Sequence, residues 1–170
     1  MIKEFTPLLL NSSFARIVNI GSISAMLPMP YGSAYSATKA ALHAYGDVLR
    51  IELAPFNIRV ITVVTGGVKS NISRPRQMPA DSLYQPVEEI YQKRGIRMSQ
   101  ETPIPTDVYA RSVVKEVLKS KPSVWFWTGY FAWMTWFMST FLWKTVFDGP
   151  LSKRVGLDKL ATIVKAKNAP

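Results

Sequence analysis

Three side chains near the start of the sequence have the types and the spacing of a proton-transfer site. Tyr35 and Lys39 are four residues apart on a predicted helix that begins near Ser33, so their side chains lie on one face about one turn apart. Ser22 follows a short apolar strand predicted over residues 17–20, at the strand end where ligands bind in open α/β sheets. We therefore expect a phenol, an ammonium and a hydroxyl to meet there.

The reduction of a ketone by hydride suits this combination. The alkoxide that forms needs a proton, and an unassisted phenol exchanges protons poorly near neutral pH. A neighbouring cation favours the phenolate, so Lys39 would assist Tyr35, while the Ser22 hydroxyl would hydrogen-bond the substrate oxygen. The hydride has to come from a nicotinamide, because side chains cannot supply one. The opposing interpretation is an ordinary amphipathic helix with an interfacial tyrosine and a solvated lysine.

The order of these residues resembles the short-chain dehydrogenase/reductase family. The matching motifs are Gly21-Ser22, Tyr35 thirteen residues after that serine, and the run Tyr35-Ser-Ala-Thr-Lys39. The resemblance implies that Ser22, Tyr35 and Lys39 are catalytic and that Tyr35 and Lys39 also contact the cofactor. It implies NADPH as that cofactor, with NADH not excluded. The absence of cysteine and the single histidine argue against a metal site.

The other elements predict an α/β fold, the C-terminal half of a Rossmann-type doubly wound parallel sheet. Residues 58–64 are β-branched and apolar, as in a central parallel strand covered on both faces. Residues 124–127 have the composition of a further strand, after an amphipathic helix over residues 107–119. No Gly-x-x-x-Gly-x-Gly motif occurs, so we expect the N-terminal βαβ units to be missing. Residues 1–128 form the predicted partial Rossmann domain.

The loop at residues 65–70 resembles the family's Pro-Gly-x-Val-x-Thr loop, with Thr65 in place of the proline. The resemblance implies that Val68 and Ser70 contact the cofactor. The alternative is a plain glycine turn after a strand.

Residues 71–106, here called the lid segment, are rich in proline and charge and are predicted to cover the substrate site. Arg74 and Arg76 in this segment could reach a phosphate on the substrate, although exposed loop arginines are more often simply solvated.

The helix that begins near Ser33 is expected to end at Pro55 and to bury one apolar stripe. Two interpretations are open for that stripe, packing on the sheet and pairing with a twin helix in a homodimer. His43 is expected to be a packed or interfacial residue. The stripe consists of Leu42, Tyr45, Leu49 and Leu53.

Residues 129–170 are predicted to be a hydrophobic helix and a basic tail that associate with a membrane. Residues 124–143 are uncharged and contain all five tryptophans, and a helix over residues 130–147 would carry a polar stripe. A helix lying in one leaflet is favoured; a full span and a buried core or dimer helix are the alternatives. The stripe consists of Thr135, Ser139, Thr140 and Lys144.

The formal net charge of +10 lies mainly outside the predicted catalytic stretch. No nucleic-acid-binding motif accompanies it, and the aromatic residues are clustered rather than interleaved with lysine and arginine. The basic excess therefore favours anionic lipid or phosphate over nucleic acid as the partner.

Residues 63–71, together with the aromatic run, resemble a fungal group within the same family, the acyl-dihydroxyacetone-phosphate reductases. This resemblance implies NADPH-dependent reduction of a lipid ketone to a lysophosphatidate-type alcohol, at the cytosolic face of the endoplasmic reticulum or of lipid droplets. One alternative is reduction or oxidation of another lipid alcohol, such as a sterol or retinoid. The other is a truncated, non-catalytic remnant that binds a membrane or a sister subunit.

Overall fold

The computed structural model describes residues 2–72, 77–95 and 100–167. Its centre is a three-stranded parallel sheet in the order β1-β2-β3. The strands are β1 (Arg16–Ile20), β2 (Arg59–Thr65) and β3 (Trp125–Thr128). Each lies within a residue of its predicted bounds, so the α/β class with a parallel sheet is confirmed.

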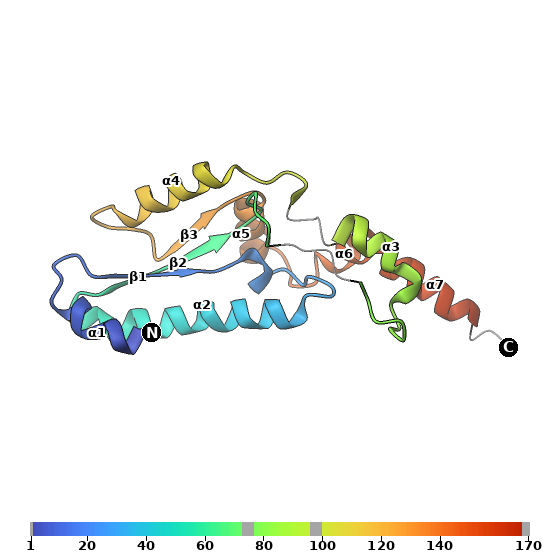
Figure 1. The fold of residues 1–170 in the computed structure, drawn as a ribbon, viewed down its shortest axis with the longest axis horizontal. Coiled ribbons are helices and arrows are strands. Elements are labelled where there is room, and N and C mark those ends of the chain that lie inside the picture. The colour runs from blue at the N-terminus through green and yellow to red at the C-terminus, as the bar shows by residue number, and fades with distance from the viewer. Residues whose placement is uncertain (1, 73–76, 96–99, 168–170) are drawn as a thin grey trace.

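Helices cover both faces of this sheet (Figure 1). Helix α2 (Ser33–Leu53) lies on one face, where Asp47 accepts a hydrogen bond from the Trp125 indole of β3. Helix α4 (Thr106–Val117) lies on the other, where Ser112 and Thr128 share a hydrogen bond. Strand β2 runs between the two layers and is buried on both sides, as its apolar composition predicts.

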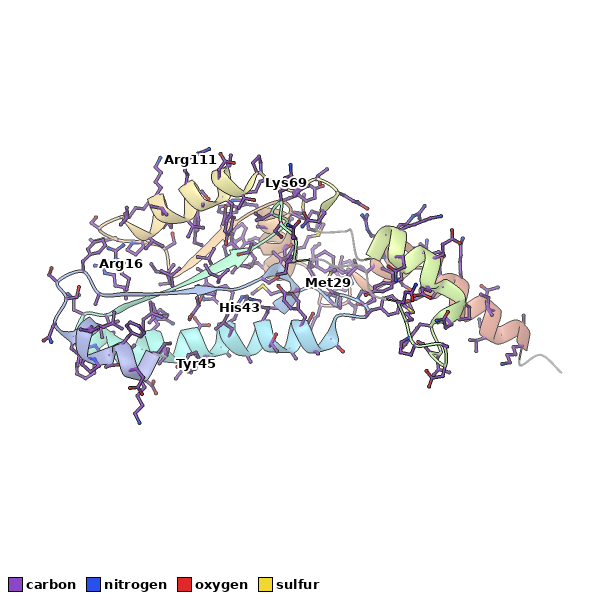
Figure 2. The ribbon with its side chains drawn as sticks, viewed as in Figure 1. Arg16, Met29, His43, Tyr45, Lys69 and Arg111 are labelled. Atoms are coloured by element: carbon purple, nitrogen blue, oxygen red, sulfur yellow. The ribbon has the colours of Figure 1, made fainter. Side chains whose placement is uncertain are left out.

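The sheet-facing stripe of α2 differs from the predicted one. The buried residues are His43, Gly46 and Leu49, whereas Tyr45 points away from the sheet and is half exposed (Figure 2). A Cβ on Gly46 would lie 2.8 Å from Oγ1 of Thr62, so α2 comes closest to the sheet where it has no side chain. This close approach fixes which face of α2 is buried, and an apolar count cannot detect it.

The ends of α2 agree with the sequence. The helix starts at Ser33, and Pro55 lies in the short 3-10 helix η2 (Ala54–Phe56) that follows it. Helix α1 (Ile2–Leu10) precedes β1, and its Ile2 and Leu9 pack on the cluster formed by β1, β2 and the C-terminal turns of α2.

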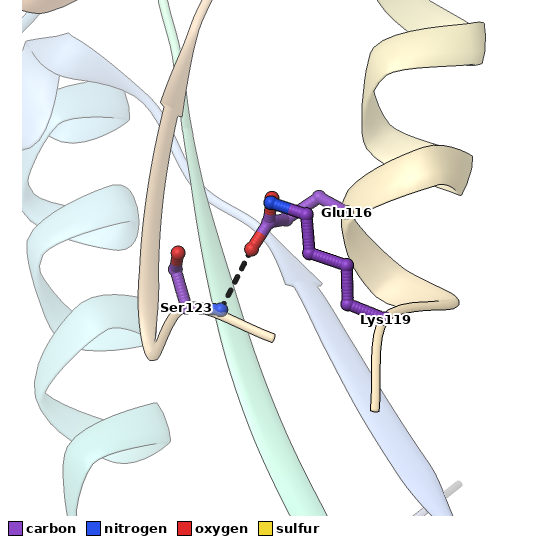
Figure 3. A network of polar contacts seen from close by, with 3 residues as sticks. All are labelled: Glu116, Lys119 and Ser123. Atoms are coloured by element: carbon purple, nitrogen blue, oxygen red, sulfur yellow. Dashed lines mark hydrogen bonds and ion pairs between the residues drawn. The ribbon is translucent and has the colours of Figure 1, made fainter. Parts of the chain in front are cut away.

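A buried carboxylate closes the turn between α4 and β3 (Figure 3). Glu116 is 4 % exposed, and its Oε1 accepts a hydrogen bond of 2.7 Å from the backbone N–H of Ser123. Its Oε2 pairs with the Lys119 ammonium. Burial raises the pKa of the Glu116 carboxyl, but the bonds from Lys119 and Ser123 outweigh burial and hold that pKa below its ordinary value.

The predicted helix over residues 130–147 is wrong. Helix α5 (Ala132–Phe141) ends after ten residues, and α6 (Asp148–Arg154) and α7 (Leu157–Lys167) follow as separate helices. Positive φ angles at Gly129, Phe131 and Gly156 mark turns of the chain in this region. In the part of the chain that the structure describes, no helix is both long and apolar enough to cross a bilayer.

The polar stripe predicted on that helix is also wrong at Thr135, which is fully buried. Its hydroxyl donates to the carbonyl of Phe131 one turn earlier, so the polar atom is satisfied inside the helix. Ala132 and Trp136 face the same way and pack against Val64 and Trp127 of the sheet. One side of α5 is therefore core.

The lid segment forms short helical turns at the end of the molecule that carries α6 and α7 (Figure 1). They are the 3-10 helix η3 (Gln85–Val87), the helical turn α3 (Glu88–Ile90) and the π-helical turn η4 (Tyr91–Gly95). A Cβ on Gly156 would touch Ile90, so the lid and the C-terminal segment are in close contact. Arg74 and Arg76 lie outside the described residues.

Candidate active site

The five site residues expected from the sequence line one cavity at the carboxyl ends of β1 and β2. They are Ser22, Tyr35, Lys39, Val68 and Ser70. The cavity has a volume of about 720 Å³ and a mostly apolar lining, which is within the range of small-molecule sites. The fold thus brings together residues that lie far apart in the sequence, from Ser22 to Ser70.

Ser22 caps the 3-10 helix η1 (Ile23–Ala25) that follows β1. Its Oγ accepts two hydrogen bonds from Ser24, one from the backbone N–H at 3.2 Å and one from the hydroxyl at 2.8 Å. Because both bonds are accepted, the Ser22 O–H can still be donated to a ligand. Ser24 was not predicted, although a Ser-x-Ser pair at a helix start is a recognisable capping signal.

Tyr35 and Lys39 face the cavity from the first turns of α2. The Lys39 ammonium lies 5.7 Å from the centroid of the Tyr35 ring, close enough for a favourable interaction of cation and ring. It also donates a hydrogen bond of 2.9 Å to the carbonyl oxygen of Ile20 at the end of β1. An ammonium has three N–H donors, so this bond fixes Lys39 without using its whole capacity.

Gly66 after β2 is needed because the chain at Tyr130 passes against it. A Cβ on Gly66 would lie 2.1 Å from the Tyr130 carbonyl oxygen, and Gly67 exchanges two backbone hydrogen bonds of 2.9 Å with Tyr130. The loop is thus more than an isolated turn, since it pairs with the segment after β3, while cofactor contact by Val68 and Ser70 stays a prediction. The backbone of Val68 pairs with Ile104 ahead of α4, and the Ser70 N–H donates to Oε1 of Gln100, so both residues are held at the cavity wall.

The far wall of the cavity comes from the lid segment, which was predicted to cover the substrate site, and from the C-terminal segment around α6, whose place at the cavity was not predicted. Phe147 and Leu151 supply apolar surface, and Arg154 forms an ion pair with Glu101 of the lid segment. No residue pattern marks these positions, because they come together only through the packing of α6 on the lid.

Three tyrosines connect the lid to the loop before α2. The Tyr31 ring lies 5.1 Å from the Tyr84 ring and 4.6 Å from the Tyr91 ring, and Tyr31 has a left-handed backbone with φ of 63°. Burial raises the pKa of Tyr31, and its two tyrosine neighbours raise it further, so this phenol stays neutral. Tyr31 and Tyr91 both line the cavity.

His43 lies behind Ser22 and is 4 % exposed, which confirms that it is packed. Its Nε2 accepts a hydrogen bond of 3.2 Å from the backbone N–H of Ser22. Burial lowers the pKa of His43; the Asp47 carboxylate raises it and the Lys39 ammonium lowers it, and the net effect is downward. The imidazole is therefore neutral at pH 7.

Comparisons with known proteins agree with this fold and site. The family model described as short chain dehydrogenase matches residues 1–81. The "Short-chain dehydrogenase fogD" of Aspergillus ruber is 41% identical over 165 residues, which cover 94% of this chain and 56% of the relative. The "NADPH-dependent 1-acyldihydroxyacetone phosphate reductase" of Saccharomyces cerevisiae is 36% identical over 169 residues, which cover 98% of this chain and 57% of the relative.

Among solved structures, a short-chain dehydrogenase from Streptomyces avermitilis superposes with a TM-score of 0.61 at 21% identity, over 99% of this chain and 58% of its own. This likeness supports the Rossmann-type fold. The chain belongs to the short-chain dehydrogenase family, and it spans slightly more than half the length of the relatives it matches.

Proposed function

We propose that this chain carries the proton-transfer and substrate-binding part of an NADPH-dependent reductase that converts a lipid ketone to a secondary alcohol. Acyl-dihydroxyacetone phosphate is the substrate we favour. The observation that carries the proposal is that Ser22, Tyr35 and Lys39 line one mostly apolar cavity. The similarity to the Saccharomyces cerevisiae reductase supports both the substrate and the choice of NADPH over NADH.

The cavity suits the nicotinamide end of such a cofactor, which would supply the hydride. Lys39 has N–H donors beyond the one that bonds Ile20, and these can hold a ribose hydroxyl. The Ser70 hydroxyl and the Val68 side chain stand at the wall formed by the loop after β2, where a polar edge and an apolar ring face can each be matched.

Proton transfer then follows from the positions of the side chains. The Ser22 O–H donates to the ketone oxygen and orients it, since its acceptor sites are already taken by Ser24. Tyr35 gives its proton to that oxygen as the carbon receives hydride. The Lys39 charge stabilises the phenolate left on Tyr35. The product is a secondary alcohol.

The far wall supports a lipid with an anionic head. Phe147 and Leu151 give an acyl chain apolar surface, and Arg154 is a cation at the same cavity. A substrate phosphate would compete with Glu101 for Arg154, whose guanidinium can form two hydrogen bonds to a phosphate. Arg74 and Arg76, the arginines first considered for this role, lie outside the described residues.

We also propose that the chain associates with a membrane, at the cytosolic face of the endoplasmic reticulum or of lipid droplets. The side of α5 that faces away from the sheet supports the membrane contact. Aromatic side chains that prefer the headgroup region are exposed there, and basic residues follow in α6 and α7. We call the exposed large apolar residues of α5, together with Trp143 just after it, the α5 surface. They are Trp133, Met134, Phe137, Phe141 and Trp143.

We also propose a homodimer, because the side of α2 that faces away from the sheet exposes apolar residues that a second copy could cover. Tyr45, Val48 and Ile51 are about half exposed or more and lie on the face opposite the sheet. Sedimentation of the purified chain tests this proposal: a monomer at tens of micromolar would exclude it.

The test of function is NADPH oxidation by the chain alone and by a fusion that adds the N-terminal segment of the Saccharomyces cerevisiae relative. Acyl-dihydroxyacetone phosphate is compared with its unphosphorylated analogue, a ketosteroid and retinal. We expect the fusion to reduce the phosphorylated ketone with the highest kcat/KM. A higher kcat/KM for the ketosteroid or for retinal would favour the alternative, a dehydrogenase or reductase of another lipid alcohol.

A titration with NADPH, read together with the activity, distinguishes the proposed reductase from the non-catalytic remnant. A fusion that binds NADPH but reduces none of the ketones would contradict the proposal and favour the non-catalytic, membrane- or subunit-binding alternative. Flotation with vesicles and sedimentation would then identify the partner.

A further inference from the structure

We propose that His43 is a positioning residue for the candidate active site: its Nε2 fixes the Ser22 loop by accepting the Ser22 backbone N–H. This inference rests on the proposed function only for its consequence in catalysis. The contact itself can be tested without any turnover.

The first support is that α2 holds the end of β1 at two points one helical turn apart. Lys39 donates to the Ile20 carbonyl at 2.9 Å, and His43 accepts from the Ser22 N–H at 3.2 Å. Gly21, the residue between these two points, and Ser22 itself set the direction of the Ser22 hydroxyl at the cavity. The Lys39 ammonium can only donate and the His43 Nε2 lone pair can only accept, so the two bonds together define how this segment lies against α2.

The second support is the fit between His43 and Gly21. A Cβ on Gly21 would lie 2.1 Å from Nε2 and 2.7 Å from Cδ2 of His43. The imidazole therefore occupies the space that any side chain at position 21 would need. The ring also contacts Trp125 of β3, whose ring centroid is 5.1 Å away at 70° (Figure 2 labels His43 between α2 and the sheet). Contacts with both Gly21 and Trp125 leave the ring little freedom.

The third support is the ring's protonation state. Since Nε2 accepts, the proton of the neutral ring is on Nδ1, and Nδ1 has no hydrogen-bond partner among the described residues. The charges that act on the ring are Asp47 and Lys39 of its own helix. The strands bring neutral groups against it, the backbone of Gly21 and Ser22 and the Trp125 indole.

Protonation would reverse the contact. An imidazolium has N–H groups at both nitrogens and would point a donor at the Ser22 N–H, also a donor. The Ser22 loop would then move off the ring and the Ser22 hydroxyl would leave its place. Activity should therefore fall as the pH drops through the pKa of His43, which lies below the ordinary value of about 6.5 because the ring is buried.

The direct test is NMR of the chain without a histidine tag, with ¹⁵N-labelled histidine and amide groups, since His43 is the single histidine. We expect the Nδ1–H tautomer near pH 7.5 and a Ser22 amide resonance that titrates with the same midpoint as the imidazole, below 6.5. An Nε2–H tautomer, or a Ser22 amide that does not follow the ring, would overturn the proposal whether or not the chain is an enzyme.

Two variants extend the test to turnover in the fusion described above. His43→Gln can present Oε1 where Nε2 stands, whereas His43→Leu fills the space without an acceptor. We expect the Gln variant to keep kcat within about tenfold and to lose the acid limb of the pH profile, and the Leu variant to lose more kcat at unchanged NADPH affinity. Equal losses in both, or an acid limb that persists in the Gln variant, would assign His43 a packing role only.

Discussion

Gly21→Ala is the substitution for which the structure gives the sharpest expectation. The new methyl group would lie 2.1 Å from Nε2 of His43, and heavy atoms do not approach a Cβ closer than about 3 Å. The ring or the loop must therefore move by about 1 Å. Overpacking of this kind costs about 1–3 kcal/mol, and a displaced ring leaves the buried Ser22 N–H unpaired at a cost of about 1–3 kcal/mol more.

We expect Gly21→Ala to lower the free energy of unfolding by about 2–4 kcal/mol, measured by urea denaturation of the chain followed by circular dichroism. His43→Ala should lower it by a similar amount, through a cavity and the same unpaired N–H. The double variant should be no less stable than His43→Ala, because the methyl group then enters space that the ring has left. The coupling energy is therefore at least as large as the loss from Gly21→Ala alone, about 2–4 kcal/mol.

Gly149→Ala is the matched control, since a Cβ at that position meets nothing within 4 Å. It should leave stability unchanged or raise it slightly, because alanine suits helix α6 better than glycine. Additive losses in the Gly21→Ala and His43→Ala pair, within about 0.5 kcal/mol, would refute the packing of the ring over Gly21.

Two further predictions follow from charge and exposure. Glu116→Gln should destabilise the chain by about 1–2 kcal/mol at pH 7, while Glu89→Gln, at an exposed pair with Lys93, should have no measurable effect. Because the folded pKa of Glu116 is depressed, its contribution is complete above about pH 4.5 and is lost as the pH falls through the folded value, so urea midpoints of wild type and Glu116→Gln should converge in acid; a constant gap would contradict this. Replacing Trp133 and Phe137 by serine should weaken binding to anionic vesicles about 30-fold in flotation, since burying each exposed ring contributes about 1 kcal/mol. Val48→Ser, on the exposed side of α2, is the control for this double variant. Equal vesicle binding by the wild type, the control and the double variant would show that the α5 surface does not bind membranes.

The sequence predicted the strands, and that Ser22, Tyr35 and Lys39 meet at one place, because local signals mark these features. A β-branched run indicates β2, Pro55 ends α2, and a four-residue spacing puts Tyr35 and Lys39 on one face. Residues 17–20 and the Gly-Ser turn lead directly to Ser22. These features depend on neighbours in the chain, so a single sequence is enough to reveal them.

The parts that were not predicted depend on distant contacts. An aromatic composition gives no sign that Thr135 is core, because its burial follows from the way Ala132 and Trp136 of the same helix meet the sheet. The exposure of Tyr45, which was predicted to belong to the buried stripe, follows from the close approach of α2 to the sheet at Gly46. Such choices are made by packing between elements, which local patterns do not encode.

The comparison of kcat for wild-type and Tyr35→Phe forms of the fusion, with NADPH and acyl-dihydroxyacetone phosphate, tests the central claim most directly. Removing the phenolic O–H takes away the proton donor but leaves the ring beside Lys39. We predict that kcat falls by about 10²–10⁴ while the dissociation constant for NADPH changes little. A Tyr35→Phe form that reduces the ketone at the wild-type rate would contradict the account.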